Sequence, residues 1–150
     1  MKSLTRCFAF ALPLVLAGTS GTAAEPAACA PTKVVYDFSS ASPASLKNLL
    51  DRVSMLQNLY ASDPFAASIV VVVHEGAVPL FARGGPLAEK ELATRAQNLA
   101  LGEIIQFRLC QASASMQGFG RKDFDAFIGL VPMADAEIAQ LQHKGDAYLH

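Results

Sequence analysis

The chain has 150 residues, of which 52% are hydrophobic and 17% are charged, and its formal net charge at pH 7 is −1. This length accommodates one domain with one apolar core. The 12 Lys and Arg residues form no basic block, which argues against a nucleic-acid-binding surface.

The first 24 residues have the pattern of a secretory signal peptide. Lys2 and Arg6 provide positive charge, residues 7–17 are apolar, and residues 18–24 are small. The apolar run is too short to cross a bilayer, which needs roughly 20 residues. We therefore expect cleavage after Ala24 and export to the periplasm or the medium. The loss of two positive charges takes the net charge from −1 to −3 and leaves no membrane segment.

Two cysteines, Cys29 and Cys110, remain after such cleavage. Cys29 lies in a proline-bracketed stretch, residues 25–32, which we interpret as an extended linker before a domain at residues 33–150. A retained apolar anchor and lipid attachment at Cys29 are alternatives to simple cleavage. In an oxidising compartment the two thiols invite a disulfide. The sequence leaves open whether Cys110 is bridged to Cys29, buried or reactive.

Strands alternate with helices along the domain, an order typical of an α/β fold with a parallel sheet. Periodicity and β-branched runs predict strands at residues 33–38, 68–74, 104–110, 126–131 and 146–150. Helices are expected at residues 44–60, 87–101 and 134–144, with a short helical or extended piece at 77–81. The second strand is apolar throughout, as expected for a strand covered on both faces. We predict a small three-layer sandwich with about five mostly parallel strands.

Cys110 ends the third predicted strand, and residues 111–115 are expected to form a small, polar loop after it. In parallel sheets the ligand crevice lies outside the carboxyl ends of the strands, so Cys110 lies where a site is expected. His74 leaves the second strand at the same edge and is a candidate general base or thiolate partner. A hydrogen-bonded histidine at a strand end is the alternative. Asp37 and Glu75 at this edge would make the crevice acidic and raise the pKa of the thiol.

A reactive cysteine must be a thiolate, which nearby positive charge or helix amides favour. Arg121 and Lys122, in the polar crossover at residues 116–124, are candidates for that charge, and the loop at 111–115 would aim backbone N–H groups at the sulfur. The alternative is a buried, inert cysteine that packs as a small hydrophobe. The sequence has no HxxxH or CxxC spacing, so we predict no metal and no cofactor.

Three stretches resemble the DsrE/DsrF-like family: IVVVVHEG at residues 69–76, FRLC at 107–110 and IAQLQHKGDAY at 138–148. The resemblance covers the chain from residue 33 to its end. It implies a flavodoxin-like α/β fold, assembly into trimers or hexamers, and a link to sulfur metabolism. It also implies that a cysteine at the place of Cys110 carries sulfur as a persulfide. The family commonly has an Asn–Thr pair after this cysteine, whereas here the residues are Gln, Ala and Ser.

These observations together predict an exported DsrE/DsrF-like protein in which Cys110 binds or relays sulfane sulfur, assisted by His74 and Arg121. The expected partners are further copies of the chain and a sulfur-carrier protein or small thiol, without nucleic acid or membrane. The alternative is a non-catalytic oligomeric module that binds a small ligand or a protein, in which Cys110 only packs. A low thiol pKa with solvent access would favour the first hypothesis, and a buried, unreactive thiol the second.

Overall fold

The computed structural model describes residues 31–60, 63, 65–84, 90–102 and 104–150. Within these residues, five parallel strands form one sheet in the order β4-β3-β2-β1-β5. The strands are β1 (Thr32–Phe38), β2 (Ala67–Val73), β3 (Ile105–Cys110), β4 (Ile128–Val131) and β5 (Ala147–Leu149). The predicted signal peptide and Cys29 lie outside the described residues.

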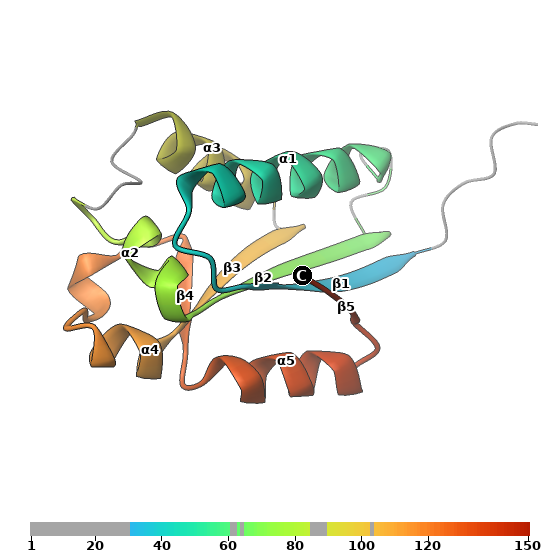
Figure 1. Cartoon of the computed structure of the whole chain (residues 1–150). Helices are drawn as coiled ribbons and strands as arrows, with labels where there is room; N and C mark the ends of the chain where they lie inside the picture. Colours follow the sequence, from blue (N-terminus) through green and yellow to red (C-terminus); the bar gives the residue numbers. More distant parts are fainter. Residues whose placement is uncertain (1–30, 61–62, 64, 85–89, 103) are drawn as a thin grey trace, which may run out of the picture.

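Helices lie on both faces of the sheet and make three layers (Figure 1). The helices α1 (Pro43–Leu59) and α3 (Lys90–Ala100) cover one face, and α5 (Ala134–His143) covers the other. Two short helices, α2 (Val78–Phe81) and α4 (Gln111–Met116), lie near the carboxyl ends of the strands. Single 3-10 turns, η1 (Glu75–Ala77) and η3 (Arg121–Asp123), complete the connections. The predicted flavodoxin-like α/β arrangement is confirmed.

The apolar run of β2 has the two covered faces that the sequence predicts. Ile69, Val71 and Val73 pack into the core beneath α1 and α3. Val70 and Val72 point the other way and pack with residues of α5. All five side chains are exposed by 2% or less, because this strand lies in the middle of the sheet between two helical layers. The position of β2 brings both of its neighbours, β1 and β3, to the same carboxyl edge.

The prediction of a loop at residues 111–115 is wrong, because these residues form most of the helix α4. Cys110 takes the N-cap position, with extended backbone angles, and its sulfur accepts a hydrogen bond from the Ser113 N–H. Ala114 packs into the core with 2% exposure, which anchors the helix against the sheet. A cap and one buried contact therefore stabilise a helix in a stretch whose serines suggested a turn.

Other boundaries differ from the sequence prediction by a few residues. β4 begins at Ile128, two residues later than expected, because the Ile128 N–H closes a turn onto the Asp125 carbonyl. The predicted polar crossover at residues 116–124 contains the 3-10 turn η3. The start of the predicted helix at residue 87 lies outside the described residues. No described helix is long and apolar enough to span a bilayer.

Candidate functional site at the carboxyl edge of the sheet

Cys110 lies where β3 passes directly into α4. Its side chain faces α5 and packs in a cluster with Val72 of β2 and with Ala134 and Ile138 of α5. The residue is 3% exposed. Among the described residues it is the free cysteine. Within the described residues the thiol is therefore unbridged, and neighbouring side chains cover it.

Backbone N–H groups from two helices surround this sulfur. Ser113 N lies 3.4 Å from Cys110 Sγ, and the amides of Ala112 and Ala134, in the first turns of α4 and α5, also interact with the thiol. Burial raises the pKa of the Cys110 thiol, but the hydrogen bonds from the Ser113 hydroxyl and from these three amides outweigh burial. The pKa lies below its ordinary value of 9.0. The N-termini of two helices thus favour the thiolate.

His74 follows β2 in extended conformation, so it continues the alternation of the strand. That alternation places His74 on the α5 side with Val72, which packs in one cluster with Cys110. Val73 pairs with Leu109, so His74 and Cys110 leave neighbouring strands at the same level. The structure therefore brings the predicted histidine and cysteine to one region, although no contact between them is recorded.

Asp37 of β1 joins His74 to a third strand. His74 Nε2 lies 2.5 Å from Asp37 Oδ1, and the Tyr148 hydroxyl donates to Asp37 Oδ2 over 2.6 Å. The hydrogen bond to Asp37, then partial burial and the charge of Asp37, raise the pKa of Tyr148 above its ordinary value of 10.0. The sequence reasoning missed Tyr148. Tyr148 pairs with Val35 of β1, and this pairing places the tyrosine on the α5 side of the sheet, beside Asp37. The pairing exists only because β5 lies next to β1, and the sequence does not specify that strand order.

The turn after His74 has an unusual backbone conformation. Glu75 has a φ of 48°, in the left-handed region that non-glycine residues rarely adopt. Such conformations cluster at functional sites, where the surrounding structure holds them. Here Gln117 provides that hold, since its side-chain amide donates to the Glu75 carbonyl over 2.7 Å and to the Ser113 carbonyl over 3.2 Å. The Gln117 side chain therefore connects the turn after β2 to α4, the helix that Cys110 caps.

The predicted acidic crevice does not act on the thiol. The Glu75 side chain is 71% exposed, with Glu75 Oε1 3.9 Å from His74 Nδ1. Both oxygens of Asp37 are engaged by His74 and Tyr148. Neither carboxylate contributes to the pKa of Cys110, which is lowered and not raised.

Arg121 does not lie beside Cys110. Its guanidinium donates to the Ile128 carbonyl over 2.5 Å and to the Asp125 carbonyl over 3.0 Å, and so holds the entry to β4. Ile128 pairs with Phe107, three positions before the pairing of Cys110 with Val131. Three strand residues span about 10 Å. The predicted assistance from Arg121 therefore has no support in its position, which depends on a register that the sequence does not specify.

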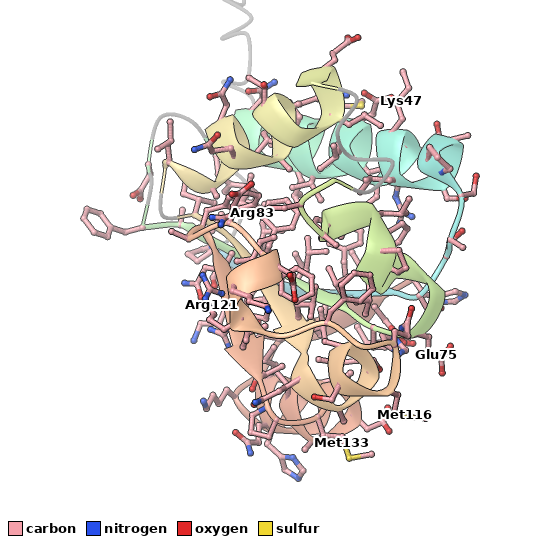
Figure 2. The ribbon with its side chains drawn as sticks, turned by 90° about the vertical axis from the view of Figure 1, so that its left-hand side faces the viewer. Lys47, Glu75, Arg83, Met116, Arg121 and Met133 are labelled. Carbon is pink, nitrogen blue, oxygen red and sulfur yellow. The ribbon has the colours of Figure 1, made fainter. Side chains whose placement is uncertain are left out.

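The exposed rim near the site carries two methionines. Met116, at the end of α4, is 87% exposed, and Met133, just before α5, is 51% exposed. Figure 2 shows both on the same side of this edge, near Glu75 and away from Arg121. The described residues contain no group of three or more His, Cys, Asp or Glu side chains that could hold a metal ion. This edge therefore combines a thiol, a histidine and an apolar rim.

Comparison with protein families matches residues 33–150 to the model described as the DsrE/DsrF-like family. Among solved structures, the chain is similar to the protein of unknown function MTH1491 from Methanobacterium thermoautotrophicum. The two share 22% sequence identity with a TM-score of 0.63, over 79% of this chain and 97% of that one. This likeness establishes the fold. Comparison with curated proteins gave no match.

Proposed function

Because the chain belongs to the DsrE/DsrF-like family over residues 33–150, we propose that it takes part in sulfur relay, with Cys110 as the sulfur-carrying residue. The observation that carries this proposal is the position of Cys110 as the N-cap of α4, where its sulfur accepts the Ser113 N–H over 3.4 Å and packs against Ala134 at the start of α5. Sulfur transfer requires a thiolate nucleophile, and the amides of Ser113 and Ala134 favour that form. Membership of the family supports the sulfur-related class, and the geometry supports the choice of residue.

The proposed step is a thiol exchange that needs no external oxidant. Cys110 Sγ, as the thiolate, attacks the outer sulfur of a donor persulfide R–S–SH. The bond between Sγ and that sulfur forms, the donor S–S bond breaks, and the electron pair leaves with R–S⁻. The hydrogen stays on the transferred sulfur, and the product is a Cys110 persulfide. His74 gives a proton to the departing R–S⁻ from Nδ1, the ring nitrogen opposite its Asp37 contact.

Reaction at the thiol requires a local opening of the structure that covers it. Cys110 is 3% exposed, so the donor reaches it only when the edge formed by α4 and the start of α5 opens. Met116 and Met133 offer a soft, apolar contact on that edge to a sulfur-carrier protein or to a second copy of the chain. We propose self-association of the kind that the family resemblance implies. Light scattering of the purified protein tests it, and a monomer at all concentrations would contradict it.

The place of action is a separate part of the proposal. Residues 1–24 have the charge and hydropathy pattern of a signal peptide, which supports export to the periplasm or the medium. Fractionation of a bacterial host that expresses the full chain, with mass measurement of the recovered protein, tests it. A product that begins after Ala24 in the exported fraction is expected. Full-length protein that stays in the cytoplasm would contradict export.

A second candidate is a non-catalytic binding module in which Cys110 only packs. The observation in its favour is the burial of the thiol among Val72, Ala134 and Ile138. Free cysteine often behaves as a small buried hydrophobe. The two candidates differ in one measurable property, which is the reactivity of the thiol in the folded protein.

The test is intact mass after polysulfide treatment, with and without alkylation by iodoacetamide. The protein carries Cys7→Ser and Cys29→Ser, so that Cys110 is its single thiol, and the matched control adds Cys110→Ser. The proposal expects an added mass of one sulfur atom that the control lacks and that dithiothreitol removes. Labelling should occur at neutral pH in the folded state. Labelling only after denaturation, with no sulfur adduct, would establish the packing role and overturn the relay.

A further inference from the structure

A hollow lies on the opposite face of the sheet from Cys110, at the carboxyl end of β1. Its volume is about 340 Å³, within the usual range for small-molecule sites. Phe38 and Leu49, both members of the core beneath α1, form its apolar floor. Ligands of open α/β sheets bind outside the carboxyl ends of the strands, so the hollow occupies a favoured position.

The positive charge of this hollow comes from Arg52 of α1, whereas the Asp37 carboxylate at its border is negative. Asp37 borders the cavity, but its two carboxylate oxygens are already bonded to His74 and Tyr148. Arg52 Nη1 donates to the His150 backbone oxygen over 3.3 Å, and its Cζ lies 5.1 Å from the centre of the Tyr36 ring. The hydrogen bond to His150 uses one N–H group of the guanidinium, and the Tyr36 ring covers one of its faces. The remaining donors form a fork of the kind that binds carboxylates and other oxyanions.

Neutral hydrogen-bond donors surround the same space. Ser45, Asn48 and Arg52 recur at helical spacing on one side of α1, so their side chains line the cavity together. Ser40 joins them from the loop between β1 and α1. The Ser40 hydroxyl oxygen accepts a hydrogen bond from the Ser42 N–H, which leaves the hydroxyl proton free to donate.

From this combination we propose that the hollow beside Arg52 is a binding site for a small oxyanion with a short apolar chain, such as a short-chain carboxylate. The anionic group binds the Arg52 guanidinium and the hydroxyls of Ser40 and Ser45. The apolar part lies on Phe38 and Leu49. The positive end of the α1 dipole adds to the attraction for an anion. The hollow and the thiol lie on opposite faces of the sheet, and Asp37, which borders the hollow and binds His74, is the residue that the two regions share.

The probes are butyrate, its neutral isostere butyramide and inorganic phosphate, each titrated into the full chain. Binding is followed by isothermal calorimetry and by the amide shifts of residues 39–52 in NMR spectra. We expect butyrate to saturate and butyramide to fail, because the two differ only in charge and donor pattern. Affinity should fall as ionic strength rises, since Arg52 is at the surface. Saturation by phosphate alone would restrict the ligand to tetrahedral oxyanions and overturn the carboxylate assignment.

Two substitutions locate the binding. Arg52→Gln should weaken butyrate binding by about tenfold or more, as expected for loss of a charge-assisted pair, and Ser45→Ala should weaken it less. Arg83→Gln removes an exposed arginine outside the cavity, where it pairs with Asp125, and should leave the affinity unchanged. Thermal melts identify any variant that fails to fold. Absence of saturable binding, or equal losses in Arg52→Gln and Arg83→Gln, would overturn the proposal. Neither result would bear on the persulfide test.

Discussion

The Asp37 carboxylate connects side chains from two other strands, and its replacement by asparagine tests how much that connection contributes. Asp37→Asn keeps the size of the side chain but removes the charge. The bond to His74, at 2.5 Å with both side chains largely covered, is the main loss. A hydrogen bond to a charged group contributes about 1.5–3 kcal/mol. An asparagine at position 37 can form only an uncharged hydrogen bond with His74. We therefore expect the free energy of unfolding to fall by about 2 kcal/mol.

Urea unfolding of Asp37→Asn measures this loss, and Asp51→Asn is the matched control. Asp51 binds Arg95 over 2.6 Å and Lys47 over 3.1 Å, but on the surface, where ion pairs contribute little. We expect an unchanged slope with urea in both variants and a clearly smaller loss in the control. Ultraviolet titration should also show the pKa of Tyr148 moving down toward its ordinary value in Asp37→Asn. Equal losses in the two variants, or an unmoved tyrosine, would refute the reasoning.

Three further results are expected. Ser113→Ala removes a hydroxyl that lowers the pKa of the Cys110 thiol, so the pH profile of iodoacetamide labelling should shift upward, and an unshifted profile would contradict that contact. Phe107→Ala empties a core site beside Phe81 and Phe127 and should cost about 3–5 kcal/mol in urea unfolding. The pKa of Cys110 is lower in the folded protein than its ordinary value of 9.0. The free energy of unfolding of wild type, relative to Cys110→Ala, should therefore increase as the pH rises from the folded pKa toward 9.0, and this increase should be absent below the folded pKa. A pH-independent difference in unfolding midpoints would count against this.

The sequence predicts the sheet well because its strands carry strong local signals. The apolar run of β2 requires cover on both faces, and the structure provides that cover. The carboxyl edge follows from parallel strands, which is why His74, Asp37 and Cys110 were expected together. Their shared edge needs only the direction of each strand, and not the register or order of the sheet.

The remaining features depend on information that local patterns do not contain. The bond between Tyr148 and Asp37 joins residues 111 positions apart and requires β5 to lie next to β1. The displacement of Arg121 from the thiol depends on the register of β4 against β3. The helix α4 was missed because its cap is a sulfur atom, whereas the usual capping residues carry oxygen.

Because the Cys110 sulfur caps α4, a chemical change at this sulfur affects the conformation of the helix. The Cys110 sulfur closes the first turn of a helix of only six residues. An N-cap contributes about 1 kcal/mol, which corresponds to a roughly fivefold change in a local equilibrium. A group added to this sulfur would compete with the Ser113 amide and so weaken the first turn of α4. In the relay proposed above, the empty and the loaded forms of Cys110 would thus differ in structure at the first turn of α4, and a partner could distinguish them by that difference.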